Sequence, residues 1–162
     1  MVDLPHGSLS PQDLRGVVES FARHPATWGD RIRHLPDQRL FEQIHLDEHL
    51  GVWLICWMDG HDTGFHDHDI SSGAFTVVSG RLREERLRFG APAAAITLDP
   101  GRSTQFAPTD IHRVVHDGDG PAVSIHAYSP PLVRMGSYVV REDGALLRRP
   151  IGPVDELRPV AA

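Results

Sequence analysis

The residues best suited to chemistry lie between Gly60 and Gly80, in the stretch GHDTGFHDHDISSGAFTVVSG. His66 and His68 are separated there by a single aspartate. Residues two apart in an extended strand point to the same face, about 6.6 Å from each other along the strand, so the two imidazoles can converge on one ion. We therefore expect His66 and His68 to be metal ligands. So short a pattern leaves open the alternative of two solvated loop histidines.

A third ligand is expected downstream, in the segment FAPTDIHRVVHDGDG, which contains His112 and His116. Four residues apart on one strand, these two histidines share a face but lie about 13 Å from each other, so both cannot reach one ion. His112 follows the turn that Pro108 predicts. We therefore predict His112 as the third ligand and His116 as a residue at the rim of the site.

The segment AVSIHAYSPP places Ser124, His126 and Tyr128 at alternate positions, and hence on one face of one strand. The chain has no GxSxG motif, which argues against a serine hydrolase. A hydroxyl, an imidazole and a phenol beside a metal would form a relay that orients a bound ligand and moves a proton. The alternative is a solvated polar face. The apolar residues between the three weaken it, because they can pack into a layer on the other side of the strand.

A fold rich in short strands must position these groups. From about residue 39 the segments between turns are rich in Val, Ile, Thr and aromatic residues, many of them alternate with polar residues, and turn signals such as DPG and DGDGP separate them. This spacing predicts an antiparallel sandwich or barrel. The preceding segment SPQDLRGVVESFARHP begins with an N-cap, Ser10, and carries apolar residues at helical spacing, so we expect a helix over about residues 10–24.

The composition of the 162-residue chain, with 40% hydrophobic and 23% charged residues, is that of a globular protein. We expect one domain over residues 1–162, with the barrel over about 39–145 and a C-terminal surface tail over about 150–162. The net charge of −6 argues against nucleic-acid binding, and the longest apolar run, GVWLICWM, is too short to span a bilayer. One cysteine, Cys56, and no recognisable secretory signal predict a cytoplasmic protein. We expect it to be a monomer.

The motifs follow one another in a specific order along the chain: CW at 56–57, HDH at 66–68, GAFTVVSGRLRE at 73–84, HRV at 112–114 and SIHAYSPP at 124–131. The spacing from Gly60 through the histidine pair to Gly80 is that of the first cupin motif, and the order of Pro108 and His112 is similar to the second. Over roughly residues 41–131 the chain resembles the cysteine dioxygenase family of cupin thiol dioxygenases.

This resemblance implies an all-β fold, a small cupin barrel (a double-stranded β-helix, or jelly roll) with an N-terminal helical segment. It implies one Fe(II) and a reaction that adds both atoms of O₂ to a small-molecule thiol to give a sulfinate. Tyr128 is expected beside the substrate and O₂. The residues carried over are the iron ligands His66, His68 and His112 and the relay Ser124, His126 and Tyr128.

Gly73 stands where the first cupin motif usually has a glutamate. Three neutral imidazoles leave a bound Fe(II) its full charge of +2, which suits a thiolate substrate that brings its own negative charge. Animal members of the family have a cysteine at this position, crosslinked to the active-site tyrosine. Because Cys56 lies elsewhere, on another strand, we expect no such crosslink at Tyr128.

Family members that oxidise cysteine carry an arginine, two residues after a tyrosine, that binds the substrate carboxylate. The best placement of that pair on this chain is Phe41-Glu42-Gln43, which puts Gln43 at the arginine position. A neutral amide would then replace a guanidinium clamp, a loss for carboxylate recognition. Related enzymes with glutamine there resemble 3-mercaptopropionate dioxygenases.

The leading hypothesis is therefore an Fe(II)-dependent dioxygenase acting on a small carboxylate-bearing thiol. L-Cysteine is the first candidate substrate, and 3-mercaptopropionate or a related mercapto-acid is the second. A zinc-dependent hydrolytic enzyme and a non-catalytic cupin that binds a small ligand are the alternatives from other classes.

Overall fold

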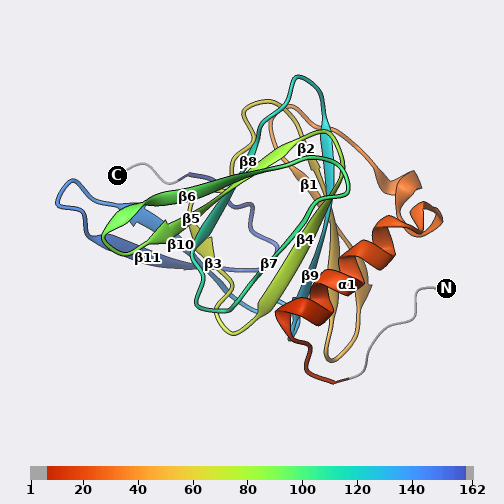
Figure 1. Cartoon of the computed structure of the whole chain (residues 1–162), viewed down its shortest axis with the longest axis horizontal. Helices are drawn as coiled ribbons and strands as arrows, with labels where there is room; N and C mark the ends of the chain where they lie inside the picture. The colour runs from red at the N-terminus through yellow and green to blue at the C-terminus, as the bar shows by residue number, and fades with distance from the viewer. Residues whose placement is uncertain (1–6, 160–162) are drawn as a thin grey trace.

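Two antiparallel β-sheets and an N-terminal helix make up the fold (Figure 1). The computed structural model describes residues 7–159. The elements are α1 (Pro11–Ala22), the short 3₁₀ turns η1 (Pro25–Thr27) and η2 (Gly29–Arg31), and the strands β1 (Leu40–Leu46), β2 (Gly51–Trp57), β3 (His66–Asp67), β4 (Ser72–Ser79), β5 (Leu82–Arg88), β6 (Ala91–Leu98), β7 (Ser103–Phe106), β8 (His112–His116), β9 (Ala122–Ser129), β10 (Met135–Val140) and β11 (Leu146–Ile151). One sheet has the order β1-β2-β9-β4-β7 and the other β11-β10-β3-β8-β5-β6.

The predicted all-β architecture with an N-terminal helix is confirmed. The sheet extends past residue 145, the predicted end of the barrel, because a last strand, β11, pairs with β10 along its whole length. Part of the segment predicted as a surface tail is therefore strand, and its last three residues lie outside the described part of the chain. No helix within residues 7–159 is both long and apolar enough to cross a membrane.

Helix α1 begins as the sequence predicts. The Ser10 hydroxyl accepts a hydrogen bond from the backbone N–H of Asp13, and the Asp13 carboxylate accepts one from the backbone N–H of Ser10, which satisfies two N–H groups at the helix start. The apolar face of the helix packs on β4, β7 and β9, and its buried residues are Leu14, Val17, Val18 and Phe21.

Strand β9 separates two hydrophobic cores. Val123, Ile125 and Ala127 face the helix and belong to the outer core with the apolar face of α1. Residues of the opposite parity face the space between the two sheets, where Tyr128 joins the inner core. This confirms the alternation predicted for β9, and it directs the polar face of the strand into the barrel.

Candidate metal centre

Three histidines meet on the inner face of the six-stranded sheet. Strands β3 and β8 are antiparallel, and His66 lies directly opposite His112 in their register. His68 follows just after β3, and one nitrogen from each of the three lies within 4.8 Å of the others. The structure thus brings together the three residues predicted as ligands. His116, farther along β8, instead bonds through Nε2 to the carbonyl of Gly120 at 2.8 Å and lies outside the cluster.

The chemistry of this cluster suits a metal ion. Each histidine is at most 3% exposed. Burial, reinforced by the neighbouring imidazoles, lowers the pKa of His66 and His68 well below the usual value, so both are in the neutral form that coordinates metals at pH 7. Nε2 of His112 and Nδ1 of His68 are buried without a hydrogen-bond partner among residues 7–159. Because a buried unpartnered nitrogen costs free energy, a metal ion at this point would relieve that cost.

A buried glutamate orients His112 from behind. Glu84 on β5 is fully buried, and its Oε1 accepts a hydrogen bond from Nδ1 of His112 at 2.7 Å. Burial alone would raise the pKa of Glu84, but the bonds from His112 and Arg86 outweigh it and lower that pKa. The ionised carboxylate holds the His112 proton on Nδ1, which directs the Nε2 lone pair toward the other two histidines.

Asp67, between the two histidines, ties β3 to its neighbours. Arg148 on β11 donates to both carboxylate oxygens, at 2.7 and 2.8 Å, and the Tyr138 hydroxyl donates at 2.6 Å. The backbone N–H of Gly136 on β10 also donates, at 3.1 Å. Burial alone would raise the pKa of Asp67, yet these hydrogen bonds lower it to about 2. A two-residue strand is thereby fixed by a charged network on its outer side.

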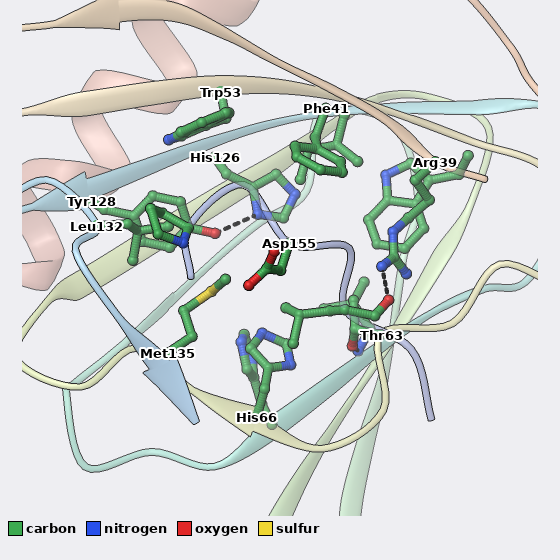
Figure 2. A pocket seen from close by; sticks show the side chains of 16 residues that line it. Arg39, Phe41, Trp53, Thr63, His66, His126, Tyr128, Leu132, Met135 and Asp155 are labelled. Carbon is green, nitrogen blue, oxygen red and sulfur yellow. Dashed lines mark hydrogen bonds between the residues drawn. The ribbon is translucent and has the colours of Figure 1, made fainter. Parts of the chain in front are cut away.

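A second group of polar side chains faces the cluster from β9. Ser124 Oγ lies 2.8 Å from Nε2 of His126. Nδ1 of the same imidazole lies 3.4 Å from the Tyr128 hydroxyl, a contact marked in Figure 2. The ring of Tyr128 lies against that of His68, with centroids 5.0 Å apart. The structure therefore places the three predicted relay residues in one hydrogen-bonded row next to the histidine cluster. Sequence reasoning missed Trp57 as a member of the row; its Nε1 donates to Ser124 Oγ at 2.8 Å.

A small cavity of about 60 Å³ opens onto both groups. His66 and His112 line it on one side and His126 and Tyr128 on the other, and most of the remaining wall is apolar. Its size limits the ligand to a small molecule. The apolar part of the wall is formed by Phe41, Trp53, Ile55, Trp57, Val114, Leu132 and Met135.

Gln43 is not among the residues that line this cavity. It is half-buried on β1 opposite Trp53, next to a register shift that separates it from His45. The arginine that does line the cavity is Arg39, just before β1. The segment expected as a surface tail also contributes to the wall, through Pro153, Asp155 and Leu157.

Gly73 leaves room for an aromatic ring. It lies between Phe106 on β7 and Tyr128 on β9 in the register of the sheet. A Cβ atom at Gly73 would come within 2.2 Å of Phe106 Cε2 and 3.1 Å of Tyr128 Cδ1. The Phe106 ring in turn stacks on His68, with centroids 4.5 Å apart. Cys56 is buried in the outer core, on the other side of the sheet from the Tyr128 ring.

Fold and site together define a small β-barrel of the cupin class that carries a three-histidine cluster able to hold a metal ion. Solved structures agree with this fold. A protein with a double-stranded β-helix domain from Klebsiella pneumoniae is 16% identical and has a TM-score of 0.56, the match covering 63% of this chain and 80% of that one. A cupin superfamily protein from Desulfitobacterium hafniense is 14% identical with a TM-score of 0.53, over 64% of this chain and 87% of that one.

The chain belongs to the cysteine dioxygenase type I family, which matches residues 10–141. Cysteine dioxygenase type 1 of Danio rerio is 27% identical over 137 residues, which is 76% of this chain and 67% of that protein. The Bos taurus protein of the same name is 26% identical over 135 residues, 76% of this chain and 66% of that protein. The match thus spans about two thirds of these relatives. The family membership predicted from the motifs, and with it a dioxygenase-type oxidoreductase, is confirmed.

Two further residues at the site escaped sequence reasoning. Glu84 lies two residues after Leu82 and so points to the same inward face of β5. An acidic residue at such a position could have been predicted from the sequence as part of the site. Arg39 shares the parity of Phe41, but only the structure shows that this face reaches the cavity.

Proposed function

We propose that this chain is an Fe(II)-dependent thiol dioxygenase that converts a small carboxylate-bearing thiol and O₂ to the sulfinic acid, R–SH + O₂ → R–SO₂H. L-Cysteine is the first candidate substrate. The observation that supports this most is the arrangement of the cavity, which is lined by His66 and His112 of the histidine cluster and by His126 and Tyr128 of the row on β9. An Fe(II) held by His66, His68 and His112 would bind the thiol as thiolate and bring O₂ next to it.

The hydrogen bonds of the relay set its direction. An indole N–H can only donate, so Trp57 occupies Ser124 as a donor. Ser124 is fully buried, and Nε2 of His126 is the one acceptor that its hydroxyl hydrogen meets within residues 7–159, so the serine donates to that nitrogen. The imidazole proton then lies on Nδ1, which faces the oxygen of Tyr128. The phenol hydrogen is left free to donate into the cavity.

The protonation states of these groups agree with that role. Burial raises the pKa of Tyr128, and burial, reinforced by the nearby charge of Arg39, lowers the pKa of His126 to about 3. Both groups are therefore neutral at pH 7. At pH 7 the neutral Tyr128 still carries its hydroxyl hydrogen and can donate it in a hydrogen bond to the thiol substrate or to O₂.

The test is O₂ uptake by the iron-loaded protein across a panel of thiols, with the sulfinate identified as product. We expect uptake with at least one carboxylate-bearing thiol and its loss in His68→Ala, which removes a ligand. His116→Gln is the matched control, since that histidine belongs to the same part of the fold but lies outside the cluster. No uptake with any thiol, alongside stoichiometric zinc in the purified protein, would overturn the proposal in favour of a zinc enzyme.

A second candidate substrate is 3-mercaptopropionate, which the neutral Gln43 at the predicted clamp position favours. If that placement is right, Gln43→Arg raises the preference for cysteine over 3-mercaptopropionate. An unchanged ratio of kcat/KM values would show that Gln43 does not contact the substrate. We also propose a cytoplasmic location and a monomeric state, which cell fractionation and size-exclusion chromatography would test.

A further inference from the structure

Arg86 on β5 links the buried Glu84 to the surface of the molecule. Its side chain is 32% exposed, whereas that of Glu84, two residues earlier on the same face of the strand, is fully buried. Nη2 of Arg86 lies 3.2 Å from Oε2 of Glu84, and no other arginine within residues 7–159 comes within ion-pair distance of this carboxylate. Because a buried carboxylate is costly without a counter-charge, Arg86 stabilises Glu84 in its buried position.

The same guanidinium joins the two sheets. Strand β5 belongs to the six-stranded sheet, whereas β7 is an edge strand of the five-stranded sheet. Nη2 of Arg86 donates to the carbonyl of Gln105 at 2.6 Å and to Thr104 Oγ1 at 2.7 Å, and both acceptors lie on β7. A carboxylate can only accept, so the Thr104 hydroxyl donates to Oε2 of Glu84 at 2.9 Å. Contacts between the sheets therefore hold both the arginine and the carboxylate.

The two oxygens of Glu84 serve different partners. Oε1 accepts the hydrogen bond from Nδ1 of His112, and Oε2 receives Arg86 and Thr104. A carboxylate whose second oxygen is fixed in this way cannot swing away from the imidazole without breaking those contacts. The direction of the His112 ring, and of the lone pair on its Nε2, therefore depends on side chains of β5 and β7 that are not ligands.

We propose that Arg86 and Thr104 are positioning residues for the metal, which hold the Glu84 carboxylate against Nδ1 of His112 and thereby raise the affinity of the histidine cluster for a metal ion. This inference rests on the metal centre of the proposed function, but not on the thiol that is oxidised. Neither residue lines the cavity, so each acts through Glu84 and His112.

Competition for Zn(II) between the metal-free protein and a chromophoric chelator measures the effect without turnover. Arg86→Met removes the charge and the donors at similar length, and we expect the affinity to fall about 10- to 100-fold. Thr104→Val keeps the shape of the side chain but loses the hydroxyl, and we expect a fall of about tenfold. Arg86→Lys keeps a positive charge with fewer donors, so it should recover part of the affinity.

Arg88→Met and Thr97→Val are the matched controls. Arg88 is the next arginine on β5, Thr97 lies on the neighbouring β6, and both are exposed with no side-chain hydrogen bond among those of the described residues. We expect both variants to bind Zn(II) as the wild type does. A guanidinium near the site also repels a cation, so an affinity that rose in Arg86→Met would mean that repulsion outweighs positioning, and the proposal would be wrong.

A double-mutant cycle with Glu84→Gln separates positioning from general support of the fold. If Arg86 acts through the carboxylate, Arg86→Met costs less affinity in the Glu84→Gln background than in the wild type. An identical cost in both backgrounds would show that Arg86 only joins the sheets, and would overturn the proposal.

The visible absorption of bound Co(II), recorded at saturation, gives a second readout because it depends on the arrangement of the ligands. We expect changed bands in Arg86→Met and unchanged bands in Arg88→Met. If the wild-type protein bound no metal, the proposed function and this inference would fail together. A wild type that binds metal, with equal affinity and equal spectra in Arg86→Met and Thr104→Val, would overturn this inference alone.

Discussion

At the scale of single residues, Trp57 controls the hydrogen bonds of the proposed relay although it contacts neither imidazole nitrogen of His126. Trp57→Phe keeps an aromatic ring beneath Arg39 but removes the N–H that occupies Ser124 Oγ. Ser124 Oγ then loses one of the two partners that fix its position, so its hydrogen bond to Nε2 of His126, and with it the proton on Nδ1 that faces Tyr128, is held less firmly. We expect kcat to fall about tenfold while metal content stays unchanged.

The control for this change is Trp28→Phe. Trp28 also donates from Nε1, to the carbonyl of Phe21 at 2.8 Å, but it lies in the outer core near the helix. We expect Trp28→Phe to lower the thermal midpoint and leave kcat unaltered. Equal kcat values for the two variants would show that Trp57 serves packing and does not orient the relay.

Gly73 is the residue whose side chain the fold excludes. Because a Cβ there would overlap the Phe106 ring, Gly73→Cys should destabilise the protein by about 1–3 kcal/mol through overpacking. Because the new side chain must shift to avoid the Phe106 ring, we expect its sulfur to form no thioether with Tyr128. The intact mass should therefore not show the loss of hydrogen that such a crosslink causes. Thermal unfolding and mass spectrometry measure the two effects.

Phe106→Ala provides the second half of a double-mutant cycle. If the overlap with Phe106 is the cause, Gly73→Cys costs less in the Phe106→Ala background than in the wild type. An identical cost in both backgrounds would place the strain elsewhere, in the backbone of β4 or against Tyr128.

At the scale of elements, the geometry of the metal ligands depends on strands that carry none of them. Strand β3 is only two residues long. Its position depends on the Asp67 carboxylate, which accepts two hydrogen bonds from Arg148 on β11. Arg148→Ala should therefore weaken metal binding about tenfold, the scale typical of groups that orient ligands. Competitive chelator titration measures this affinity.

Arg149→Ala is the neighbouring control for that experiment. Arg149 lies on the same strand but points to the other face, is exposed, and has no side-chain hydrogen bond among those of the described residues. We expect its removal to leave metal affinity unchanged. A similar loss in both variants would mean that β11 acts through general stability of the sheet and not through Asp67.

At the scale of the whole molecule, the parts that could be predicted from sequence are those fixed by strand parity. The alternation along β9 predicted both the apolar layer under the helix and the inward row Ser124–His126–Tyr128. The spacing of His66 and His68 likewise predicted that these two share a face. His112 was predicted from its place after Pro108, and it joins them because β3 and β8 pair side by side. Arg39 and Asp155 could not be found this way. They meet at the cavity because a segment more than a hundred residues after Arg39 in the chain crosses it, and local periodicity carries no information about that crossing.

The division into two cores leads to the last prediction. Phe21, on the apolar face of α1, is buried in the outer core, whereas the candidate site opens into the inner core on the other side of β9 and β4. Phe21→Ala should therefore cost about 3–5 kcal/mol of unfolding free energy, with the thermal midpoint falling by about 2–4 °C per kcal/mol, and leave kcat unchanged wherever the protein is folded.

Phe75→Leu is the counterpart in the inner core, where the Phe75 ring stacks on His126 with centroids 4.6 Å apart. It removes less volume, so we expect a smaller loss of stability but a measurable fall in kcat, because the imidazole loses the surface that fixes its plane. Unfolding curves and kcat measured on the same preparations distinguish the two effects. If Phe21→Ala lowered kcat in proportion to its loss of stability, the helix would be coupled to the site through the sheet, and the two cores would act as one unit.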